Sequence, residues 1–267
     1  MSLRTALGDG AVMTKRNLLK IGRLPDLLVF TTIQPIMFVL LFAYIFGSAI
    51  DVGGEISYRE FLMAGIFVQT VVFGATITGS SLAGDLKAGI IERFRSLPIG
   101  SSAVLIGRTT SDLLNNAIVV LIMALTGFLV GWRIRSSFLE ALAGFALLLG
   151  FAYAFSWLMA VVGLSVKSVE VVNNASFIVI FPLTFIANTF VPTTGFPAVL
   201  RNFANWNPVS ALTQAARELF GNTDPRVPVP DAWPMQNPQL ASVIAILVLL
   251  AIFIPLAISR YRKAAAR

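Results

Sequence analysis

Long uncharged runs of apolar residues recur along the chain, with short charged segments between them. Each run reaches about 20 residues, the length that an α-helix needs to cross the hydrocarbon core of a bilayer. Because lipid offers no partner to backbone N–H and C=O groups, such runs predict helices, and none shows the weak alternation of a membrane barrel strand. We therefore predict an all-α membrane domain over residues 27–259, with six spans at about 27–50, 61–84, 102–132, 141–166, 171–190 and 239–259.

The segments outside the spans have distinct patterns. Residues 1–26 place apolar residues at helical spacing among basic ones, which predicts an amphipathic helix on the inner membrane surface; the alternative is a solvated tail that only sets topology. Residues 191–238 are broken by proline and glycine, and their apolar first part predicts a partly re-entrant external segment. Within it, Pro208 to Leu219 is expected to form a short helix, with Ser210 near its start. Residues 260–267 form a basic tail.

The connection at residues 85–98 is the most informative part of the chain. Leu86, Ile90, Phe94 and Leu97 follow steps of 4, 4 and 3, which predicts a short helix with one apolar face, and Pro98 ends it. That face either lies on the membrane surface or docks into the groove of a cytoplasmic partner, and we favour docking, with the charges setting the register. The residues expected to make this contact are Leu86, Lys87, Ile90, Ile91, Glu92, Arg93, Phe94, Arg95 and Leu97.

Composition and charge support the membrane assignment. Apolar residues make up 57% of the chain and charged residues only 12%, whereas soluble domains carry about 25% charged residues. With the N-terminus inside, fourteen of the twenty Lys and Arg residues fall on the cytoplasmic side, which predicts that both termini are cytoplasmic in a bacterial cytoplasmic membrane. The net charge of +7 is thus assigned to topology and not to nucleic acid. No cleavable signal peptide is expected, because residues 1–26 lack an early apolar core.

Several kinds of chemistry are excluded by the residues that the chain lacks. It has no Cys and no His, which removes disulfides, the usual zinc ligands and every Ser-His or Cys-His catalytic pair. The segment from Gly84 to Gly89 resembles the start of a phosphate loop, but Ile90 stands where the motif needs lysine. We therefore expect no metal, no catalytic residue and no cofactor in this chain.

Polar residues inside the predicted spans are the remaining candidates for function. Asp112 is the one acid well inside an apolar run, and Arg108 precedes it by four residues, which predicts a structural ion pair on one helix face; the alternative role is a proton relay. The neutral polar residues either line a transport path or hold helices together. These residues are Gln34, Gln69, Asn115, Asn116, Asn173, Asn174 and Asn188.

This layout resembles the membrane subunit of a type-2 ABC exporter, in the daunorubicin-resistance permease-like group. The resemblance rests on the basic N-terminal helix, the six spans with both ends inside, and two local sequences. One is the cytoplasmic segment ending Glu92-Arg93-Phe94-Arg95-Ser96-Leu97-Pro98-Ile99. The other is Asn205-Trp206-Asn207-Pro208-Val209-Ser210 after the fifth span.

The resemblance implies a subunit that exports a hydrophobic or amphiphilic drug or lipid by alternating access. A separate ATPase, in two copies, would supply the energy from ATP and Mg²⁺, with residues 85–98 as the coupling helix and residues 1–26 as a connecting helix. A second copy of the chain, or a homologous permease, would complete the path among membrane lipids, with the re-entrant segment as its outer gate. An ion-coupled secondary transporter and a lipid-modifying membrane enzyme are the alternative functions.

Overall fold

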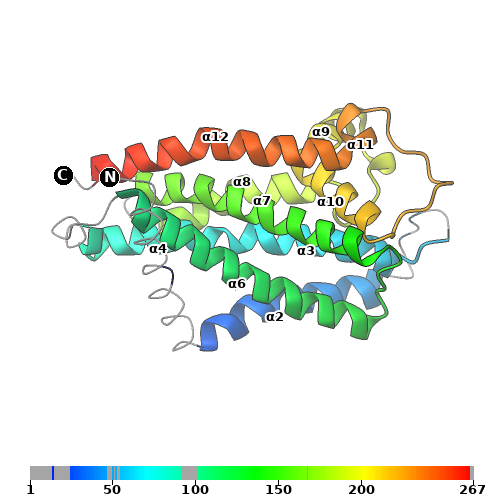
Figure 1. Ribbon diagram of the computed structural model, residues 1–267. Helices are drawn as coiled ribbons and strands as arrows, with labels where there is room; N and C mark the ends of the chain where they lie inside the picture. Colours follow the sequence, from blue (N-terminus) through cyan, green and yellow to red (C-terminus); the bar gives the residue numbers. More distant parts are fainter. Residues whose placement is uncertain are drawn as a thin grey trace.

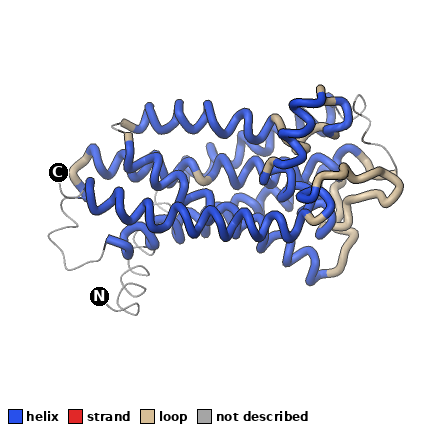
Figure 2. The backbone as a smooth tube through the Cα atoms, turned by 90° about the horizontal axis from the view of Figure 1, so that it is seen from above, coloured by secondary structure: helices blue, strands red, loops and turns tan. Residues whose placement is uncertain are grey.

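The computed structural model describes residues 14, 25–46, 50, 52, 55–91, 101–166 and 168–264. Every regular element in these residues is a helix, and no strand occurs among them (Figures 1 and 2), which confirms the predicted all-α class. The elements are α2 (Pro25–Leu41), the π-helix η1 (Phe42–Phe46), α3 (Tyr58–Gly74), α4 (Thr76–Lys87), α6 (Ser101–Val130), α7 (Phe138–Ser165), α8 (Val169–Phe185), the 3₁₀-helix η2 (Thr193–Gly195), α9 (Ala198–Trp206), α10 (Pro208–Leu219), α11 (Trp233–Gln236) and α12 (Pro238–Ala264).

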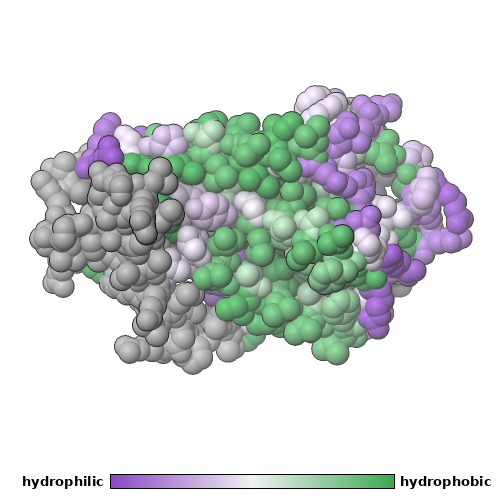
Figure 3. All heavy atoms as spheres, in the orientation of Figure 1, coloured by the Kyte–Doolittle hydropathy of each residue, from purple (hydrophilic) through white to green (hydrophobic). Residues whose placement is uncertain are grey.

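Four helical stretches in the described residues are long and apolar enough to cross a bilayer, and they correspond to predicted spans two, three, four and six. These are Tyr58–Lys87, Ser102–Val130, Phe138–Ser165 and Pro238–Ala264. The predicted first and fifth spans are shorter apolar helices, Thr32–Ile45 and Val169–Phe185. The first changes from α- to π-helix at Phe42, and the chain leaves the fifth three residues after Pro182. In Figure 3 an apolar band lies across the middle of the molecule, with a hydrophilic surface at the end that carries α9.

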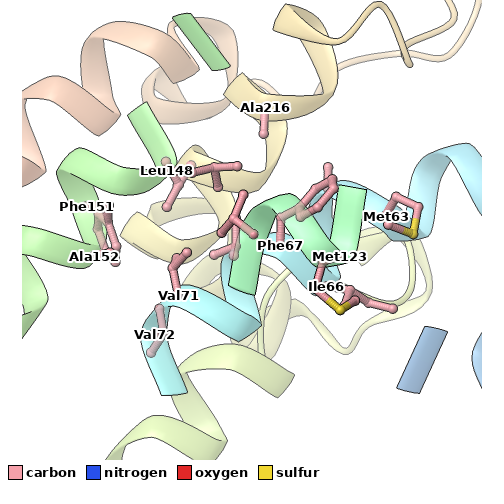
Figure 4. Close-up of a cluster of buried hydrophobic side chains, with 14 of the residues drawn as sticks. Met63, Ile66, Phe67, Val71, Val72, Met123, Leu148, Phe151, Ala152 and Ala216 are labelled. Carbon is pink, nitrogen blue, oxygen red and sulfur yellow. The ribbon is translucent and has the colours of Figure 1, made fainter. Parts of the chain in front are cut away.

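The core is built around α7, which packs against α12, α4, α6, α10, α3 and α8. Figure 4 shows part of this core, where side chains of α3, α6, α7 and α10 interdigitate, Phe67 and Leu148 among them. Phe67 also packs edge-on against Trp132 and Phe220. Burial of these large side chains from distant parts of the sequence fixes the relative positions of the long helices.

The bundle has two different ends (Figure 1). The short helices α9, α10 and α11 gather at one of them, which we call the loop end. At the opposite end, which we call the basic end, α4 stops at Lys87, and α12 stops after Arg260, Arg262 and Lys263.

Polar caps close the helices at the loop end. Ser57 and Glu60 form a capping box at the start of α3, which satisfies backbone N–H groups that have no partner within the helix. The buried Glu60 also accepts from Arg135 Nε at 2.7 Å, which ties the α6–α7 loop to α3.

The helix predicted over 208–219 is confirmed as α10. Pro208 occupies its first turn, where a missing N–H is harmless, and the Asn207 side chain caps it by accepting from Val209 N–H at 2.9 Å. The same side chain donates through Nδ2 to the carbonyls of Leu183 and Ile186, at 2.7 and 3.0 Å. Asn207 thus joins the start of α10 to the end of α8.

The predicted helix over 85–98 is wrong at its start. The α4 helix continues to Lys87, so Leu86 and Lys87 belong to the long second span. Gly89 then adopts a positive φ of 66°, a left-handed conformation that ends the helix, and Ile90 and Ile91 begin a new helical segment. Residues 92–98, with Glu92, Arg93, Phe94, Arg95 and Leu97, lie outside the described residues, as do residues 1–13, 15–24 and 265–267.

Candidate functional site

A cavity of about 280 Å³ lies among α2, α3, α4, α6 and α8. Four of the seven predicted path residues line it together, namely Gln34, Gln69, Asn115 and Asn116. The rest of its wall consists of Pro35, Phe38, Thr70, Phe73, Gly74, Thr76, Ile77, Val119 and Phe177. Four amide side chains and two threonines therefore stand in an otherwise apolar wall, an arrangement that suits an amphiphilic guest.

Irregular helix backbone creates this hollow. Pro35 removes a backbone donor from α2. Across the cavity, one predicted span is divided into α3 and α4, which meet at Ala75. Thr76 Oγ1 donates to the carbonyl of Phe73 at 2.7 Å, which supplies a side-chain partner at the break. Gly74 completes the wall, because a Cβ at that position would overlap Asn116 Oδ1.

Gly74→Ala is expected to destabilise the protein by about 1–3 kcal/mol, the usual cost of overpacking. The new methyl group has to displace the Asn116 side chain, whose Nδ2 donates to the carbonyl of Asp112 at 3.0 Å. Thermal unfolding of the purified chain in nanodiscs measures the effect. The matched control is Gly84→Ala in α4, where the added Cβ meets only Val169 at 3.7 Å; equal midpoints for the two variants would contradict this assignment.

The other three predicted path residues lie elsewhere. Asn173 is exposed on α8, where its Oδ1 accepts from Ser80 Oγ at 2.7 Å, and Asn174 is exposed beside it. Asn188 is buried at the loop end, in the wall of a different cavity. The seven residues therefore do not line one cavity within this chain, because sequence spacing does not reveal which helix faces meet.

The predicted ion pair between Arg108 and Asp112 is present, with Nε 2.9 Å from Oδ2. The same carboxylate oxygen accepts from Thr78 Oγ1 at 2.6 Å, and Arg108 Nη2 donates to Ser81 Oγ at 2.6 Å. A buried carboxylate needs such partners. Since Thr78 and Ser81 are on α4, the pair also fastens α6 to the helix that leads to the basic end, a role that the spacing of four residues did not indicate.

Arg217 is the principal functional candidate that the sequence analysis did not single out. It belongs to the predicted external segment 191–238, yet the residue is only 2% exposed. Its Nε donates to the carbonyl of Phe61 at 3.0 Å, and its Nη2 donates to the carbonyls of Asn188 and Thr189 at 2.5 and 3.3 Å. The guanidinium also lies 3.5 Å from the centre of the Phe61 ring. The available sequence signal was the apolar, alanine-rich surroundings of this arginine in α10.

In the described part of the chain, no three His, Cys, Asp or Glu residues are grouped so that they could hold a metal ion. The residues that line the cavity offer hydrogen bonding by neutral amides and hydroxyls, together with apolar contact.

Comparison with known proteins gives one consistent result. The sequence model of the family described as ABC-2 type transporter matches residues 10–220. A daunorubicin resistance ABC transporter permease protein of Streptomyces coeruleorubidus is 32% identical over 208 residues, which cover 78% of this chain and 73% of the relative. A probable doxorubicin resistance ABC transporter permease protein of Mycobacterium tuberculosis is 24% identical over 246 residues, which cover 88% and 82%. An inner membrane transport permease of Escherichia coli is 24% identical over 208 residues, which cover 75% and 79%.

Proposed function

Since this chain belongs to the ABC-2 type transporter family, we propose that it exports a hydrophobic or amphiphilic drug or lipid by alternating access, as the membrane subunit of an ATP-powered exporter. The observation that carries the proposal is the cavity lined by Gln34, Gln69, Asn115 and Asn116. Membership of the family favours this function over an ion-coupled transporter or a lipid-modifying enzyme.

The proposed topology has six spans, with the basic end in the cytoplasm of a bacterium. Four stretches of described helix are long enough to cross, and the apolar helices α2 and α8 would supply the other two spans. The basic residues near the ends of α4 and α12 support this orientation through their preference for the cytoplasmic side. The loop end would then be external, and α9 and α10 would form the re-entrant segment that gates the path.

The energy would come from a separate ABC ATPase, in two copies, that binds ATP and Mg²⁺. We propose that the segment from Leu86 to Leu97 docks on this ATPase and that residues 1–26 form a helix beside it. A mechanical connection is supported by α4, which runs from the wall of the cavity at Thr76 to the basic end, where its last two residues, Leu86 and Lys87, begin the docking segment.

A second copy of the chain, or a homologous permease, would face the cavity. The exposed side of α8 carries large apolar residues, among them Phe177, Ile178 and Phe181, and Phe177 also lines the cavity. The cavity is thus open toward a surface that suits a membrane partner. In this arrangement, two facing cavities would form one transport path.

Export through the cavity is tested with Gln69→Leu combined with Asn116→Leu, in inverted vesicles that also contain the ATPase. Both amides are buried in the wall, so their loss should reduce ATP-dependent uptake of doxorubicin about tenfold, the loss expected when about 1.4 kcal/mol of binding is removed. The control is Asn174→Leu, which is exposed on α8 outside the cavity. Equal uptake in the double variant and the control would refute the cavity as the path.

A further inference from the structure

A second cavity, of about 240 Å³, lies at the loop end and shares no lining residue with the first. Its wall is formed by Phe61 of α3, by residues 188 and 192–194 after α8, by residues of α10, and by Met235. The loop that spans residues 222–230 closes one side, and valine and proline alternate over its last four residues, 227–230. This cavity therefore lies under the external loop of a single chain.

One residue of the cavity wall, Asn188, carries an unpaired acceptor. Asn188 is 7% exposed, and its Oδ1 makes no hydrogen bond with any described residue. Its Nδ2 has only a weak contact with Met235 Sδ, at 4.0 Å. The backbone of Asn188 is satisfied, since its N–H donates to Ser210 Oγ at 3.1 Å and its carbonyl accepts from Arg217. A buried acceptor without a donor is unfavourable, so a bound group that donates to Asn188 Oδ1 would relieve this cost.

Arg217 places a donor in the wall of the same cavity. Its Nε and Nη2 are held by three backbone carbonyls, whereas Nη1 takes part in none of the hydrogen bonds found among the described residues. No carboxylate in this part of the chain forms an ion pair with it. Two buried residues of the cavity wall, Asn188 and Arg217, thus offer an acceptor and a donor.

The remaining polar groups disfavour a strongly charged ligand. Glu218 is in the wall with its pKa raised by burial, which favours its neutral form. The carboxylate of Asp224 already has hydrogen-bond partners, because it accepts from the backbone N–H groups of Arg226 and Glu55, at 2.9 and 2.7 Å. These bonds lower the pKa of Asp224. The positive Arg217 and the negative Asp224 therefore lie in the wall of the same cavity. A hydroxyl group, which both donates and accepts, fits these surroundings.

We propose that this cavity binds the hydroxylated head group of an amphiphile, such as a glycerol or a sugar ring. One hydroxyl donates to Asn188 Oδ1, an oxygen accepts from Arg217 Nη1, and the apolar part rests on the loop around Val229. The source is either phosphatidylglycerol from the outer leaflet or an exported glycosylated amphiphile. The inference depends on the proposed function for the external position of the cavity and for the exported source.

The test uses the purified full chain, without ATPase, in phosphatidylcholine nanodiscs. Calorimetry follows n-octyl β-D-glucoside below its micellar concentration, and native mass spectrometry follows phosphatidylglycerol that stays bound in mixed nanodiscs. Asn188→Leu should weaken binding at least tenfold while the unfolding midpoint stays equal or rises, because the substitution removes an unpaired acceptor and leaves the backbone bonds intact. Asn202→Leu, on the exposed side of α9, should bind as the unsubstituted chain does.

The probe whose binding depends on Asn188 identifies the source of the ligand. Asn188-dependent retention of phosphatidylglycerol identifies the lipid source, and Asn188-dependent binding of the glucoside identifies the exported source. Val229 is a half-exposed residue of the cavity wall, and Val229→Trp, which places a large side chain there, should abolish the binding of both probes. Binding that is absent, or that is indifferent to both variants, overturns the proposal. Because no ATPase is present, such a failure leaves the exporter function untouched, and a loss of ATP-driven transport does not affect this measurement.

Discussion

Phe94→Asp combined with Arg95→Glu is expected to abolish ATP-driven transport while the chain still inserts into the membrane. Both residues belong to the sequence-predicted docking segment, in the part that lies outside the described residues. A carboxylate placed in an apolar groove loses its hydration without a compensating partner, which costs several kcal/mol and is enough to remove a bound ATPase. We expect at least a tenfold loss of ATP-dependent doxorubicin uptake in inverted vesicles, together with loss of ATPase co-purification.

Arg262→Glu is the matched control for this experiment. Arg262 is exposed near the end of α12, at the same end of the bundle, and lies outside the proposed docking segment. Reversal of its charge changes the local field without placing a carboxylate in the proposed groove. Full ATP-driven uptake by the double variant would refute the coupling role of residues 85–98. Equal losses of uptake in the double variant and in Arg262→Glu would show that the changed charge, and not the docking segment, causes the effect.

Arg217→Met is expected to destabilise the protein by about 2–5 kcal/mol, the range for loss of a buried, hydrogen-bonded charge. Methionine preserves much of the volume but removes every donor. The carbonyls of Asn188 and Thr189 lie in a non-helical segment and would each lose the donor that Arg217 supplies. The contact between the guanidinium and the Phe61 ring would also be lost. Thermal unfolding in nanodiscs measures this effect, and Arg217→Lys should recover only part of it, because lysine lacks the planar fork of donors.

Arg226→Met provides the comparison, because Arg226 belongs to an exposed ion pair with Glu55, in which Nη2 is 2.7 Å from Oε1. Exposed pairs contribute about 0–1 kcal/mol, so this variant should unfold near the midpoint of the unsubstituted chain. If Arg217→Met proved no more harmful than Arg226→Met, the buried arginine would have no structural role at the loop end.

The positions of the long helices follow from sequence pattern alone. Apolar runs at 61–84, 102–132, 141–166 and 239–259 became helices whose ends differ by only a few residues, because a polypeptide in lipid has to satisfy its backbone within each segment. Pro208 after Asn207 likewise marked the start of α10 correctly. The same reasoning failed at Leu86 and Lys87, because helical spacing continued across Gly89 and concealed the turn there.

Local pattern determined the all-helical class, the basic character of the chain ends, and the ion pair of Arg108 with Asp112, whose partners are one helical turn apart. Tertiary packing alone decided that Gln69 and Asn116 share a cavity, that Asn173 does not, and that Arg217 is buried. The reason is geometric. A helix can be read from the periodicity of its own residues, whereas the neighbour of each face depends on how side chains from distant segments fill space together.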